Sequence, residues 1–379
     1  MRSLRIFGLL LLVLSLTIPV FSTARMGGID KFEHLDDIDK NSFSLSNKEF
    51  ADLINNLSEE DKGMYTGQNF VSNEASYLQI FPGALNIGVG HDVYLGVGPE
   101  QNFSYIAKFK PRVAFILDIR RDNLLEILMM KAIFEMASTP AEYLQLLLGK
   151  DGDTLQALLS GVPSNKGNKF AEGIFKKIID QLTKVRYLKL SVKDLDRLWF
   201  IYYSFFSQGE NIQCDRGPMM PTFKDLIFEK DADGELSNYL SSQESYDYVR
   251  SMHLRNAIIP VVCNFAGTKA LLSLGIWLKK HNLNVSVFYV SSVQNYIMSS
   301  DLWVNWRKNT KSLPWEKRGI FIVAFYYMGS TNESWHDEAR IGYGWMNLVW
   351  SSEEFLKSPD TPPTNYPSLS KHYIKIKYK

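Results

Sequence analysis

The chain has few of the residues that cross-link small proteins, since Cys214 and Cys263 are the only cysteines among 379 residues. A disulfide-rich scaffold is therefore excluded, as is the paired Cys spacing of a structural zinc site. The six histidines are scattered without ligand spacing. No Gly-x-Ser-x-Gly or His-Glu-x-x-His sequence occurs, so hydrolase chemistry has no motif to support it. We expect no metal site.

An excess of charge of one sign is missing too, because 42 Lys and Arg face 41 Asp and Glu, for a formal net charge of +1. No global basic field indicates a nucleic-acid partner. The chain is instead rich in core material, with 45% hydrophobic and 13% aromatic residues. Its length suits two or three average domains, or one α/β core with a large insertion.

The N-terminus has the pattern of an export signal. Two arginines precede an uncharged apolar run over residues 7–21, and the small residues Ser22 and Ala24 stand where a signal peptidase cleaves. The run is shorter than the roughly 20 residues of a membrane-spanning helix. A cleaved signal peptide over residues 1–24 is thus favoured over a retained anchor. We expect a periplasmic or extracellular protein without a stable membrane span after cleavage.

A strand, a glycine turn, a helix and a second strand are predicted over residues 92–118. Gly96 and Gly98 have no Cβ, so a ligand could approach the backbone closely at this turn. Asp118 follows by about 20 residues, at the end of the second strand, where a carboxylate binds ribose hydroxyls in nucleotide-binding folds. A third glycine is absent, and a plain tight turn in an α/β core is an equal alternative.

Alternating strands and helices continue along the chain. Residues 123–137 have helical spacing, a strand is predicted over 257–263, and a helix follows over 268–280. Further strands are predicted over 284–290 and 320–327, the latter being the last clear strand. This alternation predicts an α/β fold, a mainly parallel sheet with helices on both faces.

The remaining segments complete one domain over residues 25–356. Residues 140–255 have helical patterns and form a helical insertion, while 83–90 is predicted as a loop. Ser46 to Glu49 has the sequence of a capping box that begins a helix ending at Leu57. Residues 357–379 contain four prolines and are expected to form an extended tail.

Four segments resemble an uncharacterised bacterial protein family that is similar to class I S-adenosylmethionine (SAM) methyltransferases: 69–74, 94–102, 115–123 and 259–267. The likeness spans about residues 65–330. It implies a Rossmann-like fold whose glycine turn approaches the methionine end of SAM and whose Asp118 holds the ribose. It also implies that the end of the strand containing Val262 faces the transferred methyl. Cys263-Asn264-Phe265 replaces the family's Gly-Asp-Phe, so a carboxylate is missing there.

The candidate cofactor-binding residues lie in these segments: Asn73, Glu74, Gly96, Gly98, Glu100, Gln101, Asn102, Asp118, Arg120, Asn264 and Phe265. Alternatives exist for several of them. Ser72 or Asn73 could instead cap a helix, and Glu100 suits a helix N-terminus with or without a ligand. Arg120 and Arg121 could bind a phosphate or carboxylate, or begin a solvated helix. No catalytic residue is assigned.

Other residues have two interpretations each. Cys214 and Cys263 could form one disulfide, although Cys263 stands in an apolar run where a buried thiol packs well. Four aromatic residues could stack on a sugar or base, but such spacings more often belong to a core: Tyr296, Trp303, Trp306 and Trp315.

The leading functional hypothesis is an exported protein that binds a nucleoside-type ligand, with SAM as the cofactor and methyl transfer to an unknown acceptor. Two points weigh against an active enzyme. SAM is cytosolic, and Asn264-Phe-Ala-Gly lacks the Pro-Pro of many amino-methylating enzymes. The alternative is a non-enzymatic binding or surface-interaction protein that kept the fold and lost the cofactor. Enzymatic activity and oligomeric state stay open.

Overall fold

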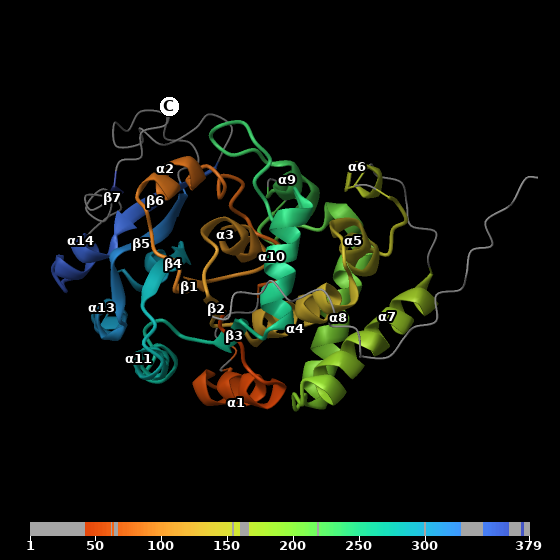
Figure 1. Ribbon diagram of the computed structural model, residues 1–379, viewed down its shortest axis with the longest axis horizontal. Coiled ribbons are helices and arrows are strands. Elements are labelled where there is room, and N and C mark those ends of the chain that lie inside the picture. Colours follow the sequence, from red (N-terminus) through yellow and green to blue (C-terminus); the bar gives the residue numbers. More distant parts are fainter. Residues whose placement is uncertain are drawn as a thin grey trace, which may run out of the picture. The chain divides into compact units, whose positions relative to one another are not determined.

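A seven-stranded sheet is the centre of the computed structural model (Figure 1). The structure describes residues 42–61, 63, 67–153, 155–159, 167–217, 220–298, 301–326, 344–363 and 373–374. From residue 43 onward the chain forms one unit. The predicted signal peptide, residues 1–24, and most of the predicted tail lie outside the described residues.

The strand order is β3-β2-β1-β4-β5-β6-β7, and the first five strands are parallel to one another. The prediction of an α/β fold with a mainly parallel sheet is confirmed. The bounds of these five are β1 (Val93–Gly96), β2 (Val113–Asp118), β3 (Ile258–Val262), β4 (Val285–Ser291) and β5 (Trp315–Tyr326).

Two antiparallel strands extend the sheet past β5, so the prediction that the strand over 320–327 is the last one is wrong. They are β6 (Trp345–Ser351) and β7 (Tyr373–Ile374). β7 lies within the segment predicted as an extended tail. β6 is buried along most of its length, and it pairs with the edge of β5.

Helices cover both faces of the sheet, as predicted (Figure 1). One face carries α3 (Gln101–Phe109), α4 (Arg121–Met136) and α10 (Gln243–Leu254). The other carries α1 (Asn47–Leu57), α11 (Ala270–Lys280) and α13 (Asp301–Ser312). Three further short helices are α2 (Phe81–Asn86), α12 (Gln294–Ile297) and α14 (Ser352–Lys357).

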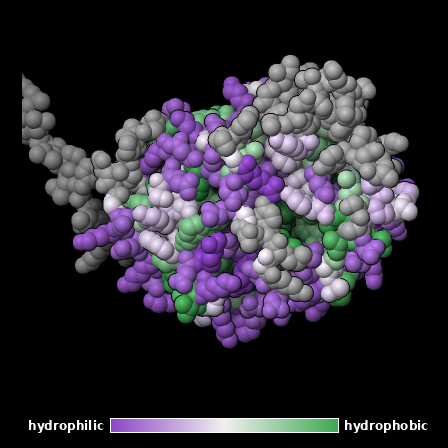
Figure 2. Space-filling model, turned by 180° about the vertical axis from the view of Figure 1, so that it is seen from behind, coloured by the Kyte–Doolittle hydropathy of each residue, from purple (hydrophilic) through white to green (hydrophobic). Residues whose placement is uncertain are grey.

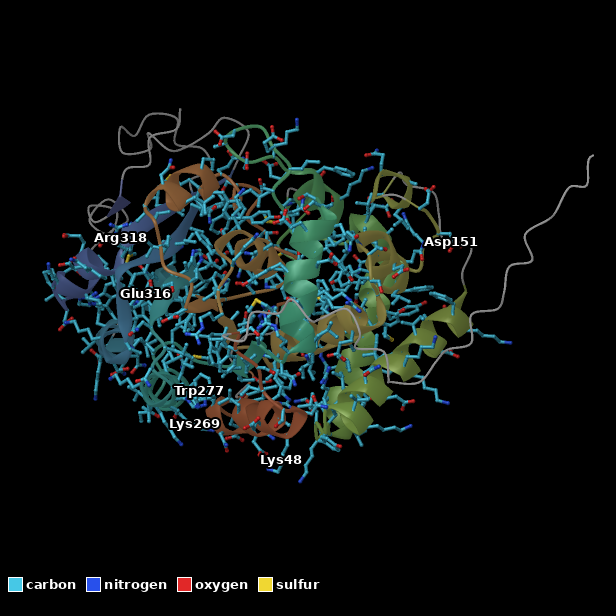
Figure 3. All side chains as sticks on the ribbon, viewed as in Figure 1. Lys48, Asp151, Lys269, Trp277, Glu316 and Arg318 are labelled. Carbon is cyan, nitrogen blue, oxygen red and sulfur yellow. The ribbon has the colours of Figure 1, made fainter. Side chains whose placement is uncertain are left out.

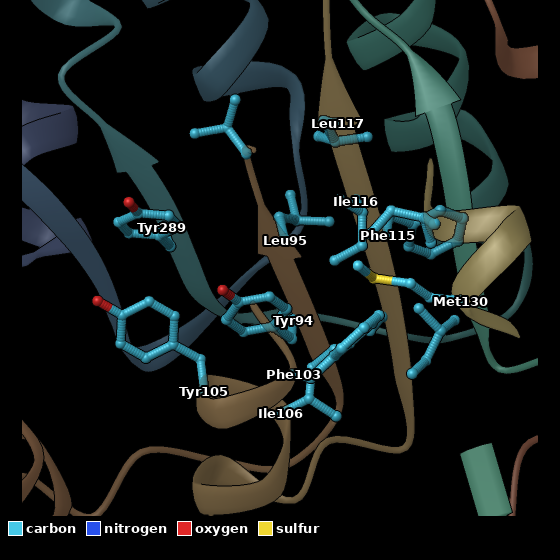
Figure 4. Packing of buried hydrophobic residues seen from close by; sticks show 14 of the residues in the cluster. Tyr94, Leu95, Phe103, Tyr105, Ile106, Phe115, Ile116, Leu117, Met130 and Tyr289 are labelled. Carbon is cyan, nitrogen blue, oxygen red and sulfur yellow. The ribbon is translucent and has the colours of Figure 1, made fainter. Parts of the chain in front are cut away.

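The core lies between these layers. Every residue of β2 is buried, which explains its unbroken apolar run, because a strand covered on both faces needs no polar side. Figure 4 shows Phe115 and Ile116 of β2 beside Leu95 of β1, with Phe103 of α3 and Met130 of α4 packed near them.

The segment between α4 and β3 contributes no strand to the sheet among its described residues. Its only bridge there pairs Gln213 with Thr222. Ion pairs tie this segment to α4, since Arg121 binds Asp194. Besides α10, its elements are α5 (Pro140–Leu148), α6 (Leu155–Leu158), α7 (Asn168–Asp180), the π-helical η1 (Gln181–Val185), α8 (Val192–Gln208), the 3-10 turn η2 (Gly209–Asn211) and α9 (Phe223–Phe228).

Helix starts follow the local sequence. The predicted capping box is present, because Ser46 Oγ accepts from the Glu49 amide at 3.2 Å and Glu49 accepts from the Ser46 amide at 2.8 Å. The predicted loop over 83–90 is partly wrong. Its first four residues belong to α2, which begins with a proline at an early helical position and buries Phe81.

The open alternatives at the two cysteines and at two of the four aromatic residues resolve toward the core. Cys214 and Cys263 are buried free thiols. Trp303 and Trp306 are also buried, whereas Tyr296 is 59% exposed. Hydrophilic residues dominate the face in Figure 2, with hydrophobic residues in small areas among them. None of the helices in the described ranges has the length and apolar character that a bilayer span requires.

Candidate functional site

A cavity of about 350 Å³ lies at the carboxyl ends of β1, β2, β3 and β4. The strand order reverses direction between β1 and β4, and ligands of open α/β sheets bind where this happens. The volume falls within the range of small-molecule sites. Eight of the predicted binding residues line this cavity: Asn73, Glu74, Gly98, Gln101, Asp118, Arg120, Asn264 and Phe265.

Gly98 is the open position of the glycine turn. Its φ is +89°, and a Cβ built there would meet no atom within 4 Å. This conformation favours glycine, and the missing side chain leaves the backbone accessible from the cavity. The turn is therefore suited to close approach of a ligand at Gly98.

Gly96 and Asn102 build the turn and do not line the cavity, contrary to the prediction. A Cβ on Gly96 would lie 1.9 Å from Asn102 Oδ1. Asn102 itself accepts a hydrogen bond from Tyr94 at 2.7 Å and donates to the carbonyls of Gly98 and Pro99 at 3.1 and 2.8 Å. Both residues are thus explained by packing and backbone hydrogen bonds inside the turn.

Glu100 is likewise absent from the cavity wall, because its side chain points into the protein. It is 2% exposed, and its Oε2 has no hydrogen-bond partner. Burial raises its pKa to about 8. Its neighbour Gln101 does reach the cavity and donates to the Tyr289 hydroxyl at 2.6 Å.

Asp118 reaches the cavity but is already engaged by Arg120. The guanidinium donates to both carboxylate oxygens, at 3.0 and 2.8 Å, and the Arg120 amide donates at 2.9 Å. Arg120 also donates to the Asn69 carbonyl at 3.2 Å. Both side chains are almost fully buried. Of the two alternatives for Arg120, a solvated helix start is therefore excluded, and the guanidinium binds a carboxylate of the chain itself.

Asn264 and Phe265 follow β3, which lies beyond β2 and not next to β1. β1, which leads into the glycine turn, pairs with β2 and β4, so the Val262 strand end is two strands away from the turn although Asn264 and Phe265 line the same cavity. Phe265 stacks on Trp306 with ring centroids 5.2 Å apart. Asn264 holds its own loop, accepting from the Ala266 amide at 3.0 Å.

Glu59 anchors this loop and was not predicted from the sequence. Its carboxylate accepts from the amides of Asn264 and Ala270 at 3.2 and 2.9 Å, at the start of α11. In Figure 3 the loop lies on the side of the molecule where Lys269 and Trp277 are labelled, near α1. Glu59 stands in a run of polar residues typical of a linker, so no local pattern could identify it.

Glu74 lies on the cavity wall and accepts three side-chain hydrogen bonds. Its Oε2 accepts from the Tyr289 hydroxyl at 2.7 Å and from Asn347 Nδ2 at 2.9 Å, and its Oε1 accepts from Ser291 Oγ. Burial raises the pKa of Glu74, and these three hydrogen bonds oppose the shift. Ser72 Oγ accepts from the Glu74 amide at 3.0 Å, but this bond closes a turn and no helix begins there, since α2 starts only at Phe81, so the alternative of a helix cap at Ser72 or Asn73 is wrong.

Ser291 ends β4 in a conformation that non-glycine residues rarely adopt. Its φ is +50°, and the pairing of β4 with β5 shifts register between Tyr289 and Ser291. Such a backbone costs about 1–3 kcal/mol and recurs at functional sites. Here it coincides with the hydrogen bond from the Ser291 hydroxyl to Glu74.

The mouth of the cavity combines apolar side chains with one cation. Tyr296, Ile297 and Leu302 line it from the region around α12 and α13. Arg216, from the segment between α4 and β3, donates to the Tyr296 hydroxyl at 2.9 Å. The helical insertion therefore supplies part of the cavity wall.

The sequence matches the model of a protein family. A family model described as "Domain of unknown function (DUF7790)" matches residues 69–367. The chain belongs to this family. The matched range contains strands β1 to β6 and the residues that line the cavity. No curated protein matches the sequence. Among the described residues, no group of three His, Cys, Asp or Glu side chains is arranged to hold a metal ion.

Proposed function

We propose that this chain is an exported protein with a Rossmann-like fold of the SAM-methyltransferase type, whose cavity binds a nucleoside-type ligand. One observation carries the proposal. The turn at Gly98, the acid at Asp118 and the Asn264 loop, far apart in sequence, meet in one cavity where the strand order reverses. Methyl transfer there would depend mainly on holding two reactants in line.

The residues fit a SAM-type ligand in part. Gly98 leaves the backbone open, and Asp118 stands at the end of the neighbouring strand. A carboxylate offers about four acceptor positions, and Arg120 fills three of those on Asp118. One position is then left for a ribose hydroxyl, so Asp118 would hold the ribose with fewer hydrogen bonds than an unpaired acid.

The same ion pair favours a second candidate, a binding protein without a cofactor. Asp118 and Arg120 satisfy each other's charge without any ligand. Because Arg120 already balances the charge of this strand-end acid, the cavity needs no bound nucleoside to stabilise the buried carboxylate. This candidate keeps the fold and assigns the cavity to a different small molecule.

Calorimetric titration with S-adenosylhomocysteine and SAM separates the two candidates. We expect wild type to bind and Asp118→Asn, which removes the charge and keeps the shape, to bind about ten- to a hundredfold more weakly. Glu244→Gln, at an exposed residue of α10, is the matched control and should bind like wild type. Absence of binding by wild type would favour the second candidate. Undiminished binding by Asp118→Asn would remove Asp118 from the site.

A further inference from the structure

In the part of the chain that the structure describes, Glu74 has no basic side chain as a partner. Two cations line the cavity, but Arg120 pairs with Asp118, and Arg216 lies against the Tyr296 hydroxyl at the mouth. Among the described residues, no basic side chain forms an ion pair with Glu74, which is 1% exposed. Buried carboxylates in proteins are paired or bind cations, because an isolated buried charge is costly.

The groups that face Glu74 are neutral. The phenols of Tyr94, Tyr105 and Tyr289 approach it from β1, α3 and β4, and Figure 4 shows these three rings near one another. Burial raises the pKa of all three, so they stay protonated at neutral pH. They supply hydrogen bonds and aromatic surface but no positive charge.

We propose that Glu74 binds the ammonium group of a small amine in this cavity. An ammonium has three N–H donors and no acceptor. Glu74 lies beside Ser291 Oγ, which donates to the carboxylate and keeps lone pairs that can accept from a ligand. Val293, Ile297 and Leu302 on the cavity wall suit an apolar body attached to the ammonium.

The amine is then the methyl acceptor. This role rests on the proposed function, whereas the binding of the amine to Glu74 is independent of it. The ammonium gives one proton to the Glu74 carboxylate and becomes a neutral amine. Its nitrogen lone pair forms a bond to the methyl carbon while the carbon–sulfur bond of the sulfonium donor breaks. The electron pair of that bond stays on sulfur. Glu74 would thus be a catalytic residue as well as a binding residue.

Benzylamine and its neutral counterpart benzyl alcohol are the probes for this proposal. We expect wild type to bind benzylamine at least tenfold more tightly at pH 7, as measured by titration calorimetry. Glu74→Gln keeps the size and one acceptor oxygen but removes the charge, so the preference should vanish. Glu100→Gln is the matched control, because Glu100 is equally buried but does not line the cavity. It should keep the preference.

Proton release gives a second measurement. Burial raises the pKa of Glu74, and a bound ammonium lowers it, so the fraction of the carboxyl group that is protonated in the free protein should lose its proton on binding. The binding enthalpy of wild type should therefore change with the ionisation enthalpy of the buffer, and that of Glu74→Gln should not. Ser291→Ala, which leaves the carboxylate in place, should weaken benzylamine binding and keep the proton release.

Equal binding of the two probes by wild type, or a preference that survives in Glu74→Gln, would overturn the proposal. Its failure is distinct from failure of the proposed function. Binding of S-adenosylhomocysteine without discrimination between the probes would leave the nucleoside site and remove the amine site. A preference for benzylamine without binding of S-adenosylhomocysteine would support the amine site and remove the nucleoside site.

Discussion

Replacing Glu100 by glutamine should stabilise the protein at neutral pH. Burial raises the pKa of Glu100 from 4.5 to about 8, so the unfolded chain ionises at a lower pH than the folded one. The buried carboxyl group therefore leaves the free energy of unfolding unchanged below pH 4.5 and lowers it progressively as the pH rises toward 8. At pH 7 the cost is about 3 kcal/mol, since each unit of pKa difference corresponds to roughly 1.4 kcal/mol.

A second acid strengthens this expectation. Glu126 of α4 is also buried, both of its oxygens lack hydrogen-bond partners, and its pKa is raised by burial and by the charge of Glu100. Ionising one of these carboxyl groups disfavours ionising the other. The amide of Glu100→Gln removes this repulsion at every pH.

Urea denaturation at several pH values measures the effect. The stability difference between Glu100→Gln and wild type should be small at pH 4.5 and should grow toward pH 8 at an unchanged m-value. Glu244→Gln is the control, because Glu244 is exposed, its pKa is lowered by Lys110, and its replacement should not stabilise the protein. A difference that is absent, or that does not change with pH, would refute the reasoning.

Three further predictions concern the turn, the ion pair and export. Gly96→Ala should destabilise the protein by about 1–3 kcal/mol through overpacking, whereas Gly98→Ala should destabilise it by about 1–2 kcal/mol through backbone strain alone. Urea denaturation measures both changes, and an unchanged stability in Gly96→Ala would contradict the packing argument. Asp118→Ala should cost about 3–5 kcal/mol, because it leaves the Arg120 charge buried and unpaired, and Asp118→Ala with Arg120→Ala should recover part of that stability. Intact mass of the protein from its own host should show cleavage after Ala24; a full-length, membrane-bound chain would contradict it.

Periodicity in the sequence determined the α/β class and most elements of the sheet. The unbroken apolar run of β2 and the capping box at Ser46 are local signals, and the structure contains both elements. β6 was missed because nothing local to its sequence shows that it pairs antiparallel with the far edge of β5. Pairing partners are set by the rest of the sheet, which a local pattern does not contain.

The candidate site was determined in part by the sequence and completed by the tertiary structure. Gly98 and Asp118 were found because a turn and a strand end have local signatures. The ion pair that neutralises Asp118 was not predicted, since its formation depends on how the Asp118 and Arg120 side chains fold back into a buried space. Glu74 meets Tyr289 and Asn347 across more than 200 residues of chain. Only the packing of distant segments creates such a low-dielectric environment, and that environment decides the protonation of a carboxyl group.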